Sequence, residues 1–385
     1  MTTDAVAAAA EVPVMETTPT AESAEDRPAR WILDVRGFSV DYGYGDQAVR
    51  AVDRVDLHLD RSTVLGVAGE SGSGKSTLVY GLTRLLRAPG VITAGQALFN
   101  RGDDEHPDVI DLTTADEKEL RSVRWSEISV VLQSALNALN PVVRVGSVFD
   151  EILSTHRRTL NKSQRRARAV ELLTLVGLNE DRLMRYPHEL SGGQRQRIMI
   201  ALALALEPKL IIMDEPTTAL DVVTQREIIS ELFTLRAHFG FAMIFITHDL
   251  SLLVQLADEI VVMYAGRLVE RASARALFSA PRHPYTLGLL NSFPPMHGAH
   301  AELNGIPGSP PDLSQPPSGC SFHPRCPYAM PRCSIDVPEL RGLDEGSRSV
   351  ACWLHSEGGV AAPVELSRRV GADRASTDQS GSVRP

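Results

Sequence analysis

Two glycine-rich segments of this chain carry main-chain groups suited to binding phosphate. The first reads Gly69-Glu70-Ser71-Gly72-Ser73-Gly74-Lys75-Ser76-Thr77 and fits the pattern G-x-x-x-x-G-K-[ST] without a mismatch. Its glycines allow N–H groups to turn toward phosphate oxygens, where a side chain with a Cβ would obstruct them. We therefore expect Lys75 to reach the β- and γ-phosphates of a nucleotide and the Ser76 hydroxyl to bind Mg²⁺.

Polar residues close several apolar runs farther along the chain. The run 210–213 ends in Asp214 and Glu215, and the run 128–132 ends at Gln133. Short apolar runs of this kind predict fully buried parallel strands. Asp214 is suited to holding Mg²⁺, and Glu215 is suited to acting as general base for an attacking water. Gln133 could contact the Mg²⁺ and the attacking water.

The second glycine-rich segment is Leu190-Ser191-Gly192-Gly193-Gln194-Arg195-Gln196, about twenty residues before Asp214. Its serine and glycine N–H groups open a helix, so they can face a γ-phosphate. This combination resembles the signature of ATP-binding cassette (ABC) ATPases. The resemblance implies that ATP lies between the phosphate loop of one cassette and the signature of a second. It also implies that His248 senses the γ-phosphate and that Asp221 lies in the loop crossing between cassettes.

Two aromatic side chains upstream of the phosphate loop are candidates for stacking on adenine. Both Tyr42 and Tyr44 present rings of the right kind. The ABC pattern places the aromatic residue just before a first glycine, which favours Tyr42. The alternative is that either ring packs on a small antiparallel sheet.

The elements that must position these residues alternate between strands and helices. Residues 31–67 read as short strands and turns, with alternation over 51–60, and residues 134–193 read as helical. Within the latter, 163–176 is amphipathic along Ala169, Leu172, Leu173 and Val176, and Gly177 stops it. A further helix is predicted over 194–206. The resemblance implies an α/β, ABC-type P-loop NTPase over 31–280, with a RecA-like core, an N-terminal antiparallel β subdomain and a helical subdomain at about 134–193.

Composition limits the remaining possibilities. The chain has 385 residues and a formal charge of −9, which argues against a general nucleic-acid binder. Residues 1–30 are acidic and rich in Ala, Thr and Pro, and 356–385 are rich in Ser, Gly and charge, so both predict disordered tails. No stretch approaches ~18 consecutive apolar residues, so we expect a cytosolic chain without a membrane span. The ABC resemblance implies a peripheral position at the cytoplasmic face of the membrane, through partner subunits.

All four cysteines lie in a proline-rich C-terminal segment, at Cys320, Cys326, Cys333 and Cys352. This segment has too few regular apolar runs to build its own core. The four clustered thiols therefore predict a bound metal that cross-links the segment. Disulfides are disfavoured in a reducing compartment. The spacing C-x5-C-x6-C-x18-C does not separate a zinc site from an iron–sulfur cluster, and unliganded buried thiols stay a third reading.

A narrower resemblance covers about 31–355. The segment Pro281-Arg282-His283-Pro284-Tyr285-Thr286 and the cysteine block 319–327 are similar to the C-terminal extension of oligopeptide/dipeptide (peptide/nickel family) ABC importers. The segments 136–141 and 306–311 are similar as well, while Arg61-Ser62-Thr63 departs from the family's usual Gly-Glu turn. The resemblance implies an extension over 281–355 whose cysteines hold a [4Fe–4S] cluster.

The resemblance also implies the partners of the chain. They are a second ABC ATPase subunit, either a copy or a paralogue, two transmembrane permease subunits and an extracytoplasmic substrate-binding protein. Peptides are the favoured cargo, with nickel or oligosaccharides as alternatives. A non-transport ABC ATPase of DNA repair or translation is the rival class, but such proteins usually carry two cassettes or long heptad coils, and this chain has neither.

Overall fold

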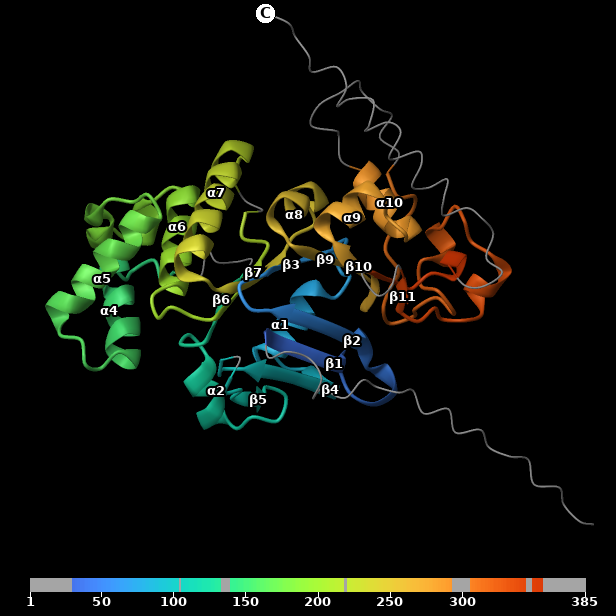
Figure 1. Ribbon diagram of the computed structural model, residues 1–385, viewed down its shortest axis with the longest axis horizontal. Helices are drawn as coiled ribbons and strands as arrows, with labels where there is room; N and C mark the ends of the chain where they lie inside the picture. The colour runs from blue at the N-terminus through green and yellow to red at the C-terminus, as the bar shows by residue number, and fades with distance from the viewer. Residues whose placement is uncertain are drawn as a thin grey trace, which may run out of the picture.

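Two β-sheets with helices around them make up the part of the chain that the computed structural model describes, residues 30–103, 105–132, 139–217, 220–292, 305–343 and 348–355. The larger sheet has the strand order β11-β12-β10-β9-β3-β8-β7-β6, and the smaller one has the order β2-β1-β4-β5. The helical segment with α4 and α5 lies at one end of the long axis in Figure 1, and the C-terminal extension lies at the other.

The larger sheet places the residues with expected chemistry at the carboxyl ends of its parallel strands. Its central strands are β3 (Val64–Ala68), β6 (Ile128–Val131), β7 (Leu210–Asp214), β8 (Ala242–Ile246) and β9 (Glu259–Tyr264). Neighbours among these five pair in parallel. β3, β7 and β8 are buried at every position, which explains why each reads as a continuous apolar run.

The smaller sheet is antiparallel and consists of β1 (Trp31–Tyr42), β2 (Val49–Asp60), β4 (Gly90–Asn100) and β5 (Val109–Asp111). The prediction of short strands over 31–67 was wrong for β1 and β2, which have 12 residues each. β1 stays continuous because register shifts between Val35 and Phe38, with Gly37 at φ +56°, bend the strand without ending it.

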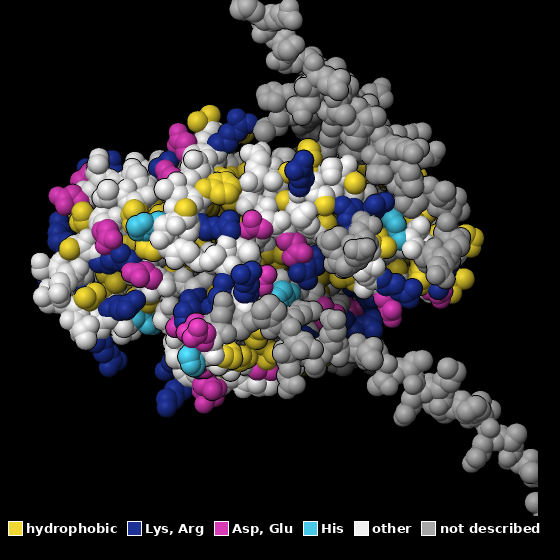
Figure 2. All heavy atoms as spheres, viewed as in Figure 1, with side chains coloured by type: hydrophobic (Ala, Val, Ile, Leu, Met, Phe, Trp, Pro, Cys, Tyr) yellow, Lys and Arg dark blue, Asp and Glu magenta, His cyan; other side chains and the backbone are white. Residues whose placement is uncertain are grey.

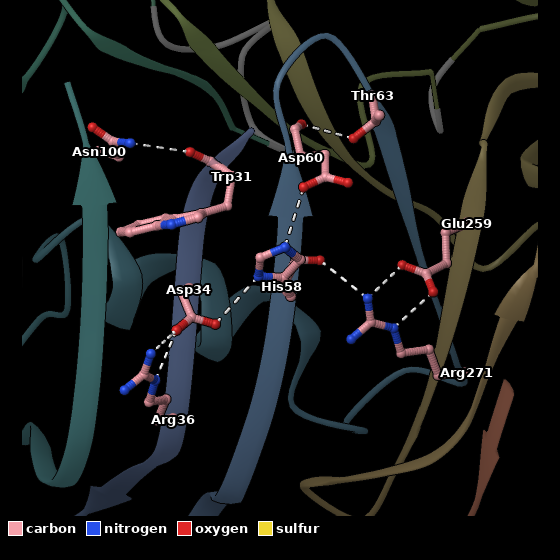
Figure 3. A network of polar contacts seen from close by, with 9 residues as sticks. All are labelled: Trp31, Asp34, Arg36, His58, Asp60, Thr63, Asn100, Glu259 and Arg271. Carbon is pink, nitrogen blue, oxygen red and sulfur yellow. Dashed lines mark hydrogen bonds and ion pairs between the residues drawn. The ribbon is translucent and has the colours of Figure 1, made fainter. Parts of the chain in front are cut away.

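A polar network joins the two sheets (Figure 3). His58 of β2 lies with Nδ1 3.3 Å from the Asp34 carboxylate of β1. Arg271 of β10 (Arg267–Ser273) donates to the His58 carbonyl at 3.4 Å and makes two 2.7 Å hydrogen bonds to Glu259 of β9. The antiparallel subdomain is therefore tied to the main sheet by charged as well as apolar contacts.

Helices cover the sheets and build the helical subdomain. They are α1 (Lys75–Leu82), α2 (Glu117–Val123), α4 (Val145–His156), α5 (Lys162–Leu175), α6 (Gly192–Ala203), α7 (Val222–Phe239), α8 (Leu250–Leu256), α9 (Ala274–Ser279) and α10 (Pro284–Asn291). The four predicted apolar positions are all buried, three of them on α5 and Val176 at its C-cap. Gly177 follows at φ +68°. The helix predicted over 194–206 is α6, which starts earlier because Ser191 caps it, and ends at Ala203.

Short 3₁₀ turns connect these elements, at η1 (Gly45–Gln47), η2 (Glu180–Met184), η3 (Pro187–Glu189), η4 (His323–Arg325), η5 (Pro331–Ser334) and η7 (Trp353–His355). On the face seen in Figure 2, acidic and basic side chains are interspersed. Within the described ranges, no helix is long and apolar enough to cross a membrane.

The C-terminal extension shares the core of the cassette. β12 (Arg348–Val350) pairs with β10, and β11 (Arg341–Leu343) pairs with β12, so both extend the main sheet. Tyr285 and Phe322 belong to the same apolar cluster as the central strands. The prediction that a metal holds this segment together was therefore incomplete, because the extension also packs on the apolar core of the main sheet.

Candidate ATP site and four-cysteine centre

The phosphate loop connects β3 to α1. At two of its positions the backbone conformation and the close neighbours admit only glycine. Gly69 has φ +149° and Gly74 has φ +102°. A Cβ on Gly69 would lie 2.4 Å from the Met263 carbonyl oxygen, and a Cβ on Gly74 would lie 2.4 Å from that of Ala51. The fold therefore requires both glycines for steric reasons, in addition to any need for close approach of phosphate.

Lys75 begins α1 and is buried, with 5% of its surface exposed. Its Nζ donates to the carbonyl oxygens of Gly69 and Glu70, both at 2.8 Å. Burial lowers the pKa of this ammonium, and the nearby carboxylates of Glu215, Asp214 and Glu70 act in the opposite direction. The charge is thus held inside the loop, where it would face phosphate oxygens.

The donors expected to bind Mg²⁺ are adjacent. The Ser76 hydroxyl donates to Asp214 Oδ1 at 3.1 Å. Asp214 is fully buried at the end of β7, and its Oδ2 has no hydrogen-bond partner in the described structure. Burial raises the pKa of this carboxyl, while the Ser76 hydroxyl and the nearby Tyr80 hydroxyl, which lies outside hydrogen-bond geometry to Oδ2, act in the opposite direction. A buried carboxylate oxygen without a partner, beside a hydroxyl, is a donor set that fits a hard divalent cation.

The expected general base and its neighbour follow β7 and β8. Glu215 adopts φ +46°, an unusual conformation for a residue with a side chain, and its N–H donates to the Ile246 carbonyl at 2.9 Å. Its Oε1 lies 3.5 Å from His248 Nδ1. The structure therefore brings together Lys75, Asp214, Glu215 and His248, while Gln133 lies outside the described residues.

The signature segment forms the start of α6, where Ser191 is exposed and the next three residues are half-buried. The Ser191 hydroxyl accepts from the Gln194 N–H at 3.3 Å, and Gln194 Oε1 accepts from the Ser191 N–H at 3.2 Å. A Cβ on Gly193 would lie 2.8 Å from Thr224 of α7. Asp221 caps α7 by accepting from the Val223 and Thr224 N–H groups, so the signature and the Asp221 segment are packed together.

The adenine candidates differ in environment. Tyr44 is 74% exposed, whereas Tyr42 is half-buried at the end of β1, beside Gly90 of β4. A Cβ on Gly90 would lie 2.9 Å from the Tyr42 ring. The Tyr42 ring thus packs on the small antiparallel sheet, which was the alternative to stacking on adenine. Stacking of Tyr42 on adenine stays a prediction.

The four cysteines line one small cavity together with His283 and Trp353. Burial raises the pKa of the Cys326 thiol to about 11 and that of Cys352 to about 12. No set of three or more His, Cys, Asp or Glu side chains in the described ranges is arranged to hold a metal ion. All four cysteines are free thiols.

A main-chain N–H group lies near each of these thiols. The N–H groups of Phe322, Tyr328 and Leu354 act on Cys320, Cys326 and Cys352 and oppose the effect of burial on their pKa values. The Met330 N–H donates to Cys333 Sγ at 3.5 Å. Such donors stabilise thiolate, the form that binds metal, but the effect of burial is larger and keeps the Cys326 and Cys352 thiols neutral as they lie here. The binding of a metal or cluster by these cysteines therefore stays a prediction.

Two residues in contact with the phosphate loop were not predicted from the sequence. The Glu70 N–H donates to the Tyr285 hydroxyl at 2.7 Å, and Arg325 makes a two-pronged ion pair with the Glu70 carboxylate. They are 215 and 255 residues away from Glu70 in the chain. Both lie in segments that resemble the importer family, but no sequence pattern relates them to the loop.

The fold and the site define the class of the protein. Residues 52–218 match the family model described as "ABC transporter". A solved ATP-binding cassette dimer in a post-hydrolysis state, bound to ADP and Pi, is similar in structure, with a TM-score of 0.55 and 28% identity over 63% of this chain and 99% of that one. The chain is therefore an ABC transporter ATPase.

The comparisons also show the narrower family. Residues 269–333 match the model described as "Oligopeptide/dipeptide transporter, C-terminal region". The dipeptide transport ATP-binding protein DppD of Escherichia coli is 42% identical over 83% of this chain and 95% of its own length. The oligopeptide transport ATP-binding protein OppD of Bacillus subtilis is 43% identical over 87% and 92%. The chain belongs to the ATP-binding subunits of oligopeptide/dipeptide ABC transporters.

Proposed function

We propose that this protein hydrolyses ATP to energise the import of di- or oligopeptides through a membrane complex. The observation that carries the proposal is the convergence of Lys75, Asp214 and Glu215 at the carboxyl ends of β3 and β7, in a chain with the peptide-transporter C-terminal region. The similar proteins DppD and OppD are named for dipeptide and oligopeptide transport, which favours peptides over nickel or oligosaccharides.

Each residue of the site has a distinct chemical task in this proposal. The loop from Gly69 through Thr77, which includes Ser71, Gly72 and Ser73, would surround the phosphates with N–H groups, and Lys75 would neutralise β- and γ-phosphate charge. Ser76 and Asp214 would hold Mg²⁺, which supplies further charge neutralisation on the phosphate oxygens. Glu215 would accept the proton of the attacking water, with His248 beside it, and Gln133 would help to orient that water.

The site would be completed by a second cassette. The helix start at Ser191, Gly192, Gly193 and Gln194 is exposed at Ser191 and partly exposed at the next three residues. We expect it to bind the γ-phosphate held by the facing subunit, with Asp221 at the crossing point. Closure of this pair would move two permease subunits at the cytoplasmic face of the membrane, with substrate supplied by an extracytoplasmic binding protein.

The four-cysteine centre is proposed to hold a [4Fe–4S] cluster through Cys320, Cys326, Cys333 and Cys352. The supporting observations are the shared cavity and the main-chain N–H groups near the thiols. The cluster would cross-link the extension by binding four thiolates. Zinc is the alternative occupant of the same donor set.

The function is tested by reconstituting the assembled transporter in vesicles with its binding protein. We expect ATP-dependent uptake of a labelled di- or oligopeptide, and loss of this uptake with Lys75→Ala. Uptake of nickel or an oligosaccharide in place of peptide would overturn the substrate assignment, and ATPase activity without any transport would favour the non-transport alternative.

A further inference from the structure

The C-terminal extension is in direct contact with the nucleotide site through Glu70. The Tyr285 hydroxyl, on α10, accepts the Glu70 N–H at 2.7 Å. Arg325, in η4, donates through Nη1 to Glu70 Oε2 at 2.6 Å and through Nη2 to Oε1 at 2.9 Å. Glu70 is the second residue of the phosphate loop, so both contacts act on the loop itself.

Both residues are buried and held by several contacts. Tyr285 is fully buried, and its ring lies 4.6 Å from the Tyr264 ring and 5.3 Å from the Phe322 ring. The Arg325 side chain is 7% exposed and also donates to the carbonyl oxygen of Pro307 at 2.7 Å. A guanidinium fixed in this way presents a planar fork that matches a carboxylate in only one orientation.

Glu70, which Tyr285 and Arg325 hold in place, also contacts the lysine expected to bind phosphate. Lys75 Nζ donates to the Glu70 carbonyl at 2.8 Å. Glu70 is thus restrained at its N–H by Tyr285, at its carboxylate by Arg325 and at its carbonyl by Lys75. A loop that is already ordered before it binds loses less conformational freedom on binding.

From these contacts we infer that Tyr285 and Arg325 are positioning residues for the phosphate loop, so that the C-terminal extension is a working part of the ATP site. The inference rests on ATP binding by this loop, as in the proposed function.

The cysteine-containing segment also positions these residues. Arg325 immediately precedes Cys326, and Phe322 follows Cys320 by two positions, so the fold of this segment sets the position of the Arg325 guanidinium.

Nucleotide affinity of the full-length chain tests the inference. Tyr285→Phe removes one hydroxyl and keeps the ring packing. The ion pair is tested with Arg325→Gln, Arg325→Lys, Glu70→Gln and the double variant Glu70→Gln/Arg325→Gln. The matched control is Arg341→Gln, whose side chain is 62% exposed in the same extension. Binding of the non-hydrolysable analogue AMP-PNP with Mg²⁺ is measured by calorimetry, and the melting temperature without nucleotide is measured in parallel.

We expect Arg325→Gln to raise the Kd about tenfold, because a charge-assisted hydrogen-bond pair has this order of effect. Tyr285→Phe should raise the Kd severalfold at nearly unchanged melting temperature, and Arg325→Lys should rescue only part of the loss. The double variant should bind no more weakly than Arg325→Gln alone, because both changes remove the same ion pair.

Two other outcomes would contradict the positioning role of Tyr285 and Arg325 or the proposed function. If Tyr285→Phe and Arg325→Gln lower the melting temperature but leave the Kd within twofold of the parent, the contacts only fasten the extension and the inference is wrong. If the parent protein itself fails to bind AMP-PNP, and Lys75→Ala changes nothing, the proposed function fails instead.

Discussion

Glu215 and His248 face one another across the ends of two adjacent parallel strands, with Glu215 Oε1 3.5 Å from His248 Nδ1. They are 33 residues apart in sequence. β7 and β8 pair in parallel with Asp214 opposite Ile246, so the residues after each strand emerge at the same edge of the sheet. Glu215 has a positive φ of 46°. Besides burial, its carboxylate also raises the pKa of the neighbouring Asp214.

Glu215→Gln is expected to retain ATP binding and abolish turnover. The amide keeps the shape of the side chain but does not accept the proton of the attacking water. General acid–base catalysis typically contributes about 10²–10⁴-fold, so the ATPase rate of the assembled transporter should fall by that factor. A rate within about tenfold of the parent would remove Glu215 as the general base.

Ser191→Arg is expected to prevent closure of the cassette pair while leaving ATP binding at Lys75 of the same chain intact. A large side chain at this exposed helix start blocks the approach of a facing phosphate loop. The measurements are AMP-PNP affinity of the isolated subunit and ATPase activity of the complex. Ser230→Arg, at an exposed position of α7, serves as control. Loss of nucleotide binding by the isolated Ser191→Arg subunit would show that the signature acts within its own chain.

Gly74→Ala is expected to disrupt the phosphate loop far more than Gly37→Ala. Both glycines have positive φ, so alanine is strained at either position by about 1–3 kcal/mol. Only at Gly74 does the new Cβ meet a carbonyl oxygen, at 2.4 Å, whereas at Gly37 nothing lies within 4 Å. AMP-PNP affinity should therefore fall at least tenfold for Gly74→Ala and stay near the parent for Gly37→Ala. Equal losses in the two variants would mean that backbone strain alone decides the effect.

Anaerobically purified protein is expected to be brown and to contain about four iron and four sulfide per chain. Cys326→Ser should bleach the protein and lower its melting temperature, because one ligand of the proposed cluster is lost. Ser321→Ala, beside Cys320, is the matched control and should keep the iron content. Stoichiometric zinc without iron, in protein prepared without air, would contradict the cluster and support a Zn(Cys)₄ site.

The sequence predicted the local elements that carry the candidate site, because these elements depend on short-range patterns. The phosphate loop, the buried strand before Asp214 and the apolar face of α5 each follow from spacing within a few residues. The capping box that starts α6 at Gly192 is also local, and overlooking it placed the start of the helix two residues too late.

Only the tertiary structure decided how distant segments meet. The pairing of β7 with β8 brings Glu215 to His248, and the addition of β12 to β10 makes the extension part of the cassette core. Nothing in the local pattern around Arg325 or Tyr285 specifies Glu70 as their partner, because that contact depends on the path of over two hundred intervening residues. The sequence thus determined which candidate ATP-binding groups this protein has, and packing of the sheet and extension determined which of them lie together.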